Sequence, residues 1–292
     1  MRKIKLAIIS GKGGVGKSMV ASSFLILFSK KRKVVALDCD VDAPNLSIWL
    51  NEFSKPKVIK YVKTNLVAKV NQKKCKKCDK CISACPFGAI EKRDNKIQVN
   101  EFLCEGCGVC EIVCPAKAFL LRPIRNGKII IRETKYGFPL IEGSLIPGRT
   151  GSGKIVDEVK KEGEKFDYQL MIIDSAPGTG CPVNAVIRDI DWAIIVTEPT
   201  LSGFSDAKKV LKVVEYFGVN WRLIINKWDI NKKFTRKIEN YFKGRVMGKI
   251  SYNPKIFQAI SHLKPVLETN LPTKEELIQI FHKLEKILYA KT

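Results

Sequence analysis

Residues 11–18 restrict the folds open to this chain more than any other segment. They read Gly-Lys-Gly-Gly-Val-Gly-Lys-Ser and fit the pattern G-x-x-x-x-G-K-[ST]. They follow an apolar run, 4–9, and precede a segment, 19–30, whose apolar residues have helical spacing. A glycine-rich loop between a strand and a helix places backbone N–H groups around phosphate, so the segment predicts a nucleotide site. The predicted contact residues are Gly11, Lys12, Gly13, Gly14, Val15, Gly16, Lys17 and Ser18.

Two side chains of this loop have specific expected roles. Lys17 is expected to reach the β- and γ-phosphates of ATP, and Ser18 is expected to bind Mg²⁺. A second segment, 148–154, repeats the G-x-x-x-x-G-K spacing, but Ile155 replaces the hydroxyl residue. We expect it to be a helix N-terminus beside the first site.

The pattern of apolar segments predicts an α/β fold. The first forty residues have strand–loop–helix–strand character, which is typical of a βαβ unit on a parallel sheet. Segment 128–146 predicts a hairpin. Beyond residue 151 we expect helices at 154–164 and 205–216, strands at 170–173, 192–196 and 222–225, and a last helix that starts at Thr273 with Glu276 completing a capping box. Residues 1–65 and 124–292 therefore predict one discontinuous domain with a doubly wound, mainly parallel sheet.

Eight of the ten cysteines form two matching cassettes. Both follow the spacing C-x2-C-x2-C-x3-C-P, and they begin 29 residues apart at Cys75 and Cys104. This is the bacterial ferredoxin spacing, in which three cysteines bind one cluster and the fourth binds the other. Zinc fits the spacing poorly. We therefore predict that residues 66–123 are an inserted small α+β ferredoxin-like domain with two 4Fe–4S clusters.

The spacing also predicts which cysteines share a cluster. The first cluster is expected on Cys75, Cys78, Cys81 and Cys114, and the second on Cys104, Cys107, Cys110 and Cys85. Two neighbouring clusters predict an electron path, with a purely structural role as the alternative. Of the remaining cysteines, Cys39 is expected to be buried, and Cys181 is an open candidate for a redox or ligand role.

The chain is strongly basic, with a formal net charge of +23. Ten lysines and one acid, Asp79, lie within residues 55–81. Solvated lysines without a partner are one interpretation, and an acidic partner, either an electron-carrier protein or a nucleic acid, is the other. No run of 18 apolar residues occurs and the first residues have no secretory signal pattern, so we expect a cytoplasmic protein without a transmembrane segment.

Lys12 gives the loop a second lysine, in the pattern K-G-G-x-G-K-[ST]. This form resembles the family of MinD and ParA ATPases, the Mrp-type cluster carriers and the nitrogenase iron protein. The resemblance extends to Asp38 and Asp40 after the second strand, to the segment 174–178, to Asn226, and to 251–266, where Ser251 replaces a more usual proline. The whole chain looks like a MinD-superfamily ATPase with an inserted ferredoxin domain.

The resemblance implies roles for individual residues. Lys12 would reach the phosphates of a partner subunit across a nucleotide-dependent homodimer. Asp174 would support the Mg²⁺ shell, Asp40 would orient or accept a proton from the attacking water, and Asn226 would contact adenine. Asp38 is a weaker candidate for Mg²⁺. The expected catalytic set is Lys12, Lys17, Asp40 and Asp174.

Three functions fit these residues. The first is a Mg²⁺-dependent ATPase that couples nucleotide state to electron transfer through two 4Fe–4S clusters, toward a redox partner or a metallocofactor enzyme. The second is an iron–sulfur cluster carrier, which the eight fully ligating cysteines disfavour. The third is a DNA- or membrane-organising partition-type ATPase.

Overall fold

The structure is a computed structural model and describes residues 3–289. Nine strands form its central sheet. Their order across the sheet is β13-β12-β11-β1-β10-β2-β9-β8-β3. The strands are β1 (Ile4–Ser10), β2 (Val34–Cys39), β3 (Val58–Val62), β8 (Gly127–Glu133), β9 (Pro139–Leu145), β10 (Leu170–Pro177), β11 (Trp192–Thr197), β12 (Asn220–Asn226) and β13 (Val246–Ile250).

The pairing is parallel from β13 through to β9, and β8 pairs antiparallel with both β9 and β3. The mainly parallel sheet and the hairpin expected at 128–146 are thereby confirmed. Because parallel strands point the same way, their carboxyl ends meet at one edge of the sheet. The loops that carry the predicted site residues leave the sheet along this edge.

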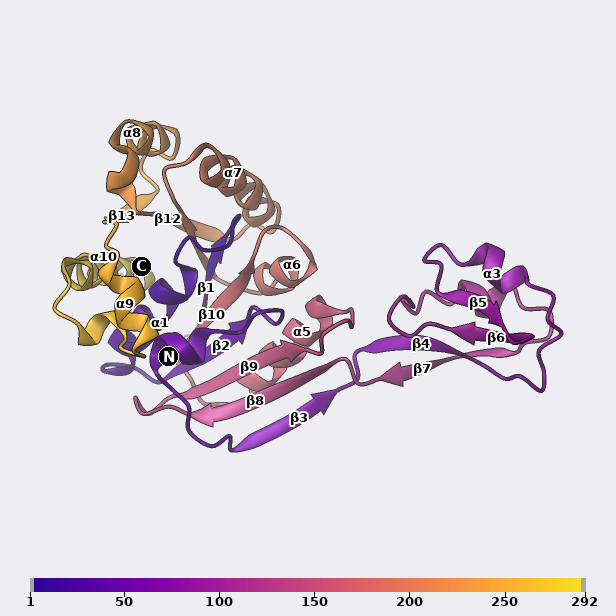
Figure 1. The fold of residues 1–292 in the computed structure, drawn as a ribbon. Coiled ribbons are helices and arrows are strands. Elements are labelled where there is room, and N and C mark those ends of the chain that lie inside the picture. Colours follow the sequence, from indigo (N-terminus) through magenta and orange to yellow (C-terminus); the bar gives the residue numbers. More distant parts are fainter. Residues whose placement is uncertain (1–2, 290–292) are drawn as a thin grey trace.

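Helices cover both faces of the sheet (Figure 1). The helices of the body are α1 (Lys17–Ser29), α2 (Leu46–Leu50), α5 (Ser152–Gly163), α6 (Cys181–Ile187), α7 (Leu201–Tyr216), α8 (Lys232–Tyr241), α9 (Lys255–Ser261), α10 (Pro272–Tyr289) and the short 3₁₀ segments Trp228–Asn231 and Val266–Glu268.

Alternate residues of each strand enter two separate apolar cores. Ala7 and Ile9 of β1 pack with α5, α6, α7 and α8, whereas Leu6 and Ile8 pack with α1, α2 and α10. All four side chains are fully buried. Burying one such side chain contributes about 1.5–3 kcal/mol, so a sheet covered on both faces is a rigid support for its edge loops.

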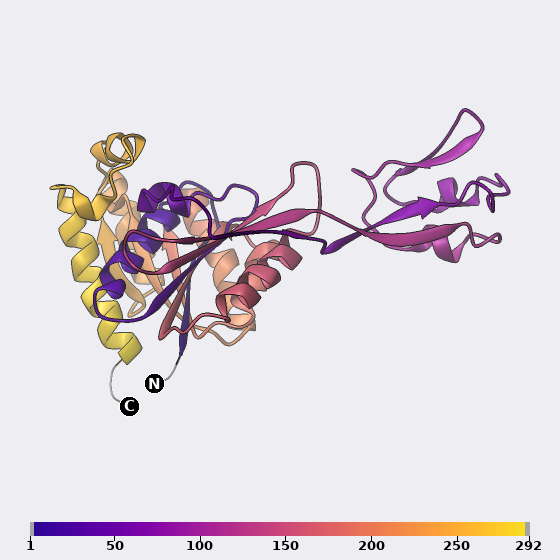
Figure 2. The ribbon, with the colours of Figure 1, turned by 90° about the horizontal axis from the view of Figure 1, so that it is seen from below.

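A small module projects from the sheet, and Figures 1 and 2 show it standing away from the body on a two-stranded ribbon. We call residues 65–124 the insert. Its two sheets are the antiparallel pair β4 (Asn65–Val70) and β7 (Phe119–Ile124), which we call the arm, and the antiparallel pair β5 (Ile90–Arg93) and β6 (Lys96–Val99). Two short helices, α3 (Lys80–Ala84) and α4 (Val109–Ile112), pack against each other.

The capping box expected at the start of the last helix is wrong. α10 begins one residue earlier, at Pro272, and the Thr273 hydroxyl is buried without a hydrogen-bond partner within residues 3–289. The Glu276 carboxylate instead accepts hydrogen bonds from the backbone N–H (2.9 Å) and the hydroxyl of Ser251. Glu276 therefore binds Ser251 of the neighbouring loop instead of the start of its own helix.

Across residues 3–289, no helix combines the length and the apolar character that crossing a bilayer requires.

Candidate functional site

The loop between β1 and α1 has the backbone shape that a phosphate site needs. Gly14 and Gly16 adopt positive φ angles of 73° and 98°. A Cβ on Gly16 would lie 2.4 Å from Nδ2 of Asn226, so this position accepts only glycine. Asn226 Nδ2 in turn donates to the Val15 carbonyl oxygen (2.8 Å), which fixes the loop against the end of β12. Asn226 thus lies at the predicted site, where its amide also holds the loop.

A cavity of about 490 Å³ opens beside this loop. Gly13, Gly14, Gly16, Lys17, Ser18 and Asp40 line its phosphate end. Its opposite end is formed by Trp49 and by the loop and helix after β13, through Tyr252, Pro254, Ile256, Phe257 and Ile260. A polar, glycine-rich end and an aromatic, apolar end match the two halves of a nucleotide.

Lys17 and Asp40 face each other in the phosphate end of the cavity. Lys17 is 6% exposed, and burial lowers the pKa of its ammonium group, while Asp174, Asp40 and Asp38 oppose the shift. Burial raises the pKa of the half-buried Asp40, and the Lys17 charge opposes it. The three carboxylates thus oppose the loss of charge that burial favours.

Asp174 lies at the carboxyl end of β10 and is 1% exposed. Burial raises its pKa to about 7, and the Ser18 hydroxyl and the Lys17 charge oppose the shift. Neither carboxylate oxygen has a hydrogen-bond partner of acceptable geometry within residues 3–289. A buried carboxylate without donors beside a hydroxyl fits a site for a divalent cation. Ser18 and Asp174 are therefore the residues that suit Mg²⁺.

Asp38 differs from its expected role as a metal-ligand candidate. It is fully buried and accepts three backbone N–H bonds, from Asp40 (3.1 Å), Asn45 (2.9 Å) and Leu46 (2.9 Å). These bonds fix the loop that leads from β2 to α2. Asp38 is absent from the cavity lining, whereas Asp40 lies in it. The structure thus separates the two carboxylates into a loop-shaping residue and a site residue.

Lys12 is bound within its own subunit by Glu198, which the sequence did not single out. Lys12 Nζ lies 2.9 Å from Glu198 Oε1, and Lys227 Nζ lies 3.2 Å from Oε2. Burial disfavours the charged form of Glu198, but hydrogen bonds from both lysines outweigh it and hold its pKa below the usual value. Glu198 follows β11 directly, so the rule that sites lie at strand carboxyl ends could have identified it.

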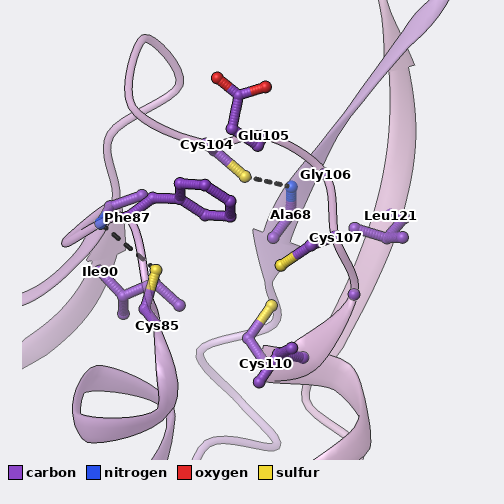
Figure 3. A pocket seen from close by; sticks show the side chains of 13 residues that line it. Ala68, Cys85, Phe87, Ile90, Cys104, Glu105, Gly106, Cys107, Cys110 and Leu121 are labelled. Carbon is purple, nitrogen blue, oxygen red and sulfur yellow. Dashed lines mark hydrogen bonds between the residues drawn. The ribbon is translucent and has the colours of Figure 1, made fainter.

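In the insert, the second cluster's expected cysteines line one pocket. Figure 3 shows the sulfur atoms of Cys85, Cys104, Cys107 and Cys110 pointing toward a common space. We call these four the proximal group, because Gly106 packs against the backbone of Leu66 at the inner end of the arm. Backbone N–H groups of Ala68 and Ala89 donate to the sulfur atoms of Cys104 and Cys85, each at 3.4 Å.

The first cluster's expected cysteines lie near the other end of the arm. We call Cys75, Cys78, Cys81 and Cys114 the distal group. Cys75 follows the outer end of β4 and Cys114 precedes the outer end of β7, where Val70 pairs with Phe119. Burial raises the pKa of the Cys81 thiol, and the neighbouring Cys75 and Cys114 add to the shift. The Ala118 N–H donates to Cys114 Sγ (3.3 Å), as Ala89 does to Cys85.

Within residues 3–289, no three His, Cys, Asp or Glu side chains converge closely enough to hold one metal ion. A 4Fe–4S cluster takes its thiolates at four separate iron corners, and its potential depends on hydrogen bonds to sulfur. The ring of four sulfurs in the proximal group and the N–H···S bonds in both groups fit that chemistry. Cluster ligation by these eight cysteines stays a prediction.

One loop joins the body to the insert. Residues 146–151 leave the carboxyl end of β9, and Arg149 Nη2 lies 3.2 Å from the Glu101 carboxylate while its guanidinium lies 4.9 Å from the centre of the Phe102 ring. Thr150 accepts a hydrogen bond (2.9 Å) on its carbonyl oxygen from the fully buried Asn126 at the base of the arm. Glu101 and Phe102 lie three and two residues before Cys104 of the proximal group.

The same loop also contacts the segment after β10. It leads into α5, where a Cβ on Gly153 would lie 3.1 Å from the Cys181 carbonyl oxygen. Cys181 begins α6 four residues after Pro177, which lines the nucleotide cavity. The segment 148–154 is thus a helix N-terminus at the base of the arm, as expected, and none of its residues lines the nucleotide cavity. The Cys181 side chain is exposed, and its role stays open.

A family model for the CobQ/CobB/MinD/ParA nucleotide-binding domain matches residues 6–266. The chain belongs to this family. An uncharacterised protein of Methanocaldococcus jannaschii is 36% identical to it over 98% of both chains. An uncharacterised ATP-binding protein of the same organism is 22% identical over 96% of this chain and 87% of its own. This CobQ/CobB/MinD/ParA family member is therefore an ATPase-type nucleotide-binding protein.

Solved structures agree with the family's fold. The septum site-determining protein MinD of Pyrococcus horikoshii, complexed with Mg-ADP, superposes with a TM-score of 0.61 at 17% identity, covering 99% of both chains. A MinC:MinD cell division protein complex of Aquifex aeolicus gives a TM-score of 0.60 at 19% identity, covering 97% of this chain and 95% of that one. These TM-scores show that the family member has a MinD-like fold. At identities this low, the comparison shows the fold alone.

Proposed function

We propose that this family member is a Mg²⁺-dependent ATPase whose nucleotide state controls electron transfer through two 4Fe–4S clusters in the insert. The observation that carries the proposal is the loop 146–151. Through Arg149 it contacts Glu101 and Phe102, which shortly precede Cys104 of the proximal group, and α5 after it contacts the segment that follows Pro177 in the nucleotide cavity. A change at the nucleotide therefore has a short, packed route to the cysteines.

In the nucleotide cavity, Ser18 and Asp174 would hold Mg²⁺, which supplies charge neutralisation at the phosphates when bound. The chain's own groups do the rest. Lys17 pairs with the phosphate oxygens, and the backbone N–H groups of the glycine loop orient them. Asp40, the only carboxylate lining the cavity within the described residues, orients the attacking water and accepts its proton. Trp49 and Phe257 hold the base.

In the insert, the proximal and distal groups would each hold one 4Fe–4S cluster, which supplies one-electron transfer when bound. Amide donors at Ala68, Ala89 and Ala118 stabilise the anionic thiolates. The proximal group lies against Leu66 and Ala68 of the arm, whereas the cysteines of the distal group lie beyond its outer end at Val70 and Phe119. The proximal group therefore lies between the body and the distal group.

Dimerisation would complete the nucleotide switch. Lys12 is held by Glu198 in this subunit, on a side chain that is 41% exposed. Release of that ion pair frees the ammonium group to bind phosphate oxygens of a second subunit. The order of events would be nucleotide binding, release of Lys12, and closure of two copies, with hydrolysis reversing them.

The deciding experiment is an EPR-monitored redox titration of anaerobically purified protein without nucleotide, with ADP and with a non-hydrolysable ATP analogue. We expect two low-potential clusters whose potentials or spin coupling change with nucleotide. In Arg149→Ala the change should shrink while ATP hydrolysis persists, and Arg236→Ala, an exposed arginine on α8, serves as the matched control. Absence of a low-potential cluster signal would refute the electron-transfer proposal.

A second candidate is a partition-type ATPase that organises DNA. The MinD-like fold and the charge of +23 favour it. Duplex DNA binding that requires ATP and weakens steeply with salt would support it. Nucleotide-independent or undetectable DNA binding at physiological salt would exclude it.

A further inference from the structure

The two cysteine cassettes match in spacing but differ in charge. The repeat of 29 residues aligns each position around Cys75 with one around Cys104. The aligned pairs are Lys73 with Phe102, Lys74 with Leu103, Lys76 with Glu105, Lys77 with Gly106, and Lys80 with Val109. Because both cassettes belong to one small module, the lysine content of the chain as a whole does not explain this difference.

The lysines of the first cassette face solvent. Lys73, Lys74, Lys76, Lys77 and Lys80 are all exposed, and none forms an ion pair within residues 3–289. We call these five the lysine tip. The neighbouring acid, Asp79, is already paired with Lys92 at 2.9 Å. Desolvating five unpaired ammonium groups is favourable only against a partner that supplies negative charge.

The corresponding residues of the second cassette are used within the molecule. Glu101 is paired with Lys69 and with Arg149, and Phe102 lies against Arg149 and Gly148. That side of the insert faces the body. The lysine tip lies at the outer end of the arm, beside the distal group, where Cys78 is exposed.

An exposed apolar side chain lies on α4, the helix that packs against α3. Ile112 of α4 is 82% exposed, and α4 packs against α3, which begins at Lys80. An exposed apolar group among polar and charged side chains is the usual composition of a transient protein–protein interface. A groove for a nucleic-acid backbone has no need of such an apolar group.

We propose that the lysine tip is the docking surface for an acidic electron-transfer protein. The electron step rests on the proposed function: one electron leaves the reduced partner and enters the cluster held by the distal group. The charge of the tip steers the partner to the outer end of the insert. A partner bound there lies nearer the distal group than the proximal one.

The test compares two triple variants with the same change in charge. One is Lys73→Glu, Lys76→Glu and Lys77→Glu in the tip. The control is Lys212→Glu, Lys233→Glu and Lys243→Glu, three exposed lysines of the body. The probe is an acidic plant-type [2Fe–2S] ferredoxin, with a basic cytochrome c as the opposite-charge probe. The affinity is measured by calorimetry at low and high salt, and the electron-transfer rate by stopped flow.

We expect the tip variant to weaken ferredoxin binding at low salt by about tenfold or more, and the control to change it by less than about twofold. The tip variant should also gain affinity for cytochrome c. Equal losses in both variants, or no ferredoxin binding by the wild type, would overturn the docking proposal. The proposal would also be overturned if the wild type bound duplex DNA more tightly than ferredoxin and only the tip variant lost that DNA binding.

Iron and sulfide analysis separates this proposal from the one on which it rests. Protein without clusters refutes electron transfer, yet the calorimetric comparison still decides whether the tip binds an acidic protein. Protein with clusters and without a difference between the variants refutes docking alone.

Discussion

Asp38 and Asp174 are neighbours across β2 and β10 and have opposite surroundings. The two residues pair in register, and each is fully or almost fully buried. Asp38 accepts three backbone N–H bonds, whereas the Asp174 carboxylate, with the Ser18 hydroxyl beside it, accepts no hydrogen bond of acceptable geometry in the described part of the chain. The apoprotein therefore carries a destabilising carboxylate that nucleotide and metal would neutralise.

Replacing the Asp174 carboxylate by a neutral amide is expected to stabilise the apoprotein. Asp174→Asn should increase the free energy of unfolding of the apoprotein at pH 7 by about 1–4 kcal/mol and abolish ATP hydrolysis. Urea unfolding and phosphate release measure the two effects. Asp94→Asn, at an exposed turn, is the control and should leave both unchanged. A less stable Asp174→Asn protein would contradict the account.

The pH dependence of that gain follows from the raised pKa. A carboxyl group with a pKa of about 7 when folded, against an ordinary value of 3.8, favours the folded state only while it is protonated. Wild-type apoprotein should lose stability relative to Asp174→Asn as the pH rises from about 4 to about 7. Unfolding curves at several pH values test this. A constant difference across that range would show that Asp174 is already ionised.

The charge of the Glu198 carboxylate is expected to oppose nucleotide-dependent dimer formation. Glu198→Gln removes the charge that holds Lys12 and Lys227, so the lysine would be freer to reach a second subunit. We expect nucleotide-dependent dimers at ATP concentrations roughly three- to tenfold lower, the equivalent of about 1 kcal/mol. Analytical ultracentrifugation measures this shift, with Glu215→Gln as an exposed control. An unchanged or higher ATP requirement would refute it.

Among the elements, the base of the arm depends on one buried amide. Asn126 accepts a hydrogen bond from the Thr64 N–H (2.8 Å) and donates to the Thr150 carbonyl oxygen and the Thr64 hydroxyl. Asn126→Ala should cost about 2 kcal/mol, because it leaves buried backbone groups without partners. Hydrogen exchange should quicken in β4 and β7, whereas Asn220→Ala, on an exposed position, should leave it unchanged. Unaltered exchange in the arm would mean that other contacts hold it.

The sequence predicted those features that depend on local spacing. Strand and helix periodicity, the glycine-loop pattern and the cysteine spacing are each defined by residues a few positions apart. The α/β elements appear where they were expected. Glu198 and Arg149 were missed because their roles depend on which strands are neighbours. Thr273 was misassigned because Glu276 finds its partner in a loop 25 residues away in sequence.

For the molecule as a whole, the insert leaves and returns at adjacent points. Val62 of β3 pairs with Gly127 of β8, so deleting residues 65–124 leaves four residues to close the hairpin. The shortened protein should keep its nucleotide affinity within about threefold and its melting temperature within about 5 °C. Thermal unfolding and nucleotide titration test this. Aggregation or lost nucleotide binding would show that the body needs the insert to fold.

The arm is a ribbon fixed at one end. Both of its strands continue the β3–β8 pair, and Asn65, Asn126 and Arg149 form contacts between its base and the loop 146–151. When the arm rotates about its base, each part of it moves by a distance proportional to its separation from the base. A tilt at Asn126 would move the distal group further than the proximal group. The range over which the tip can search for a partner is therefore set at the base.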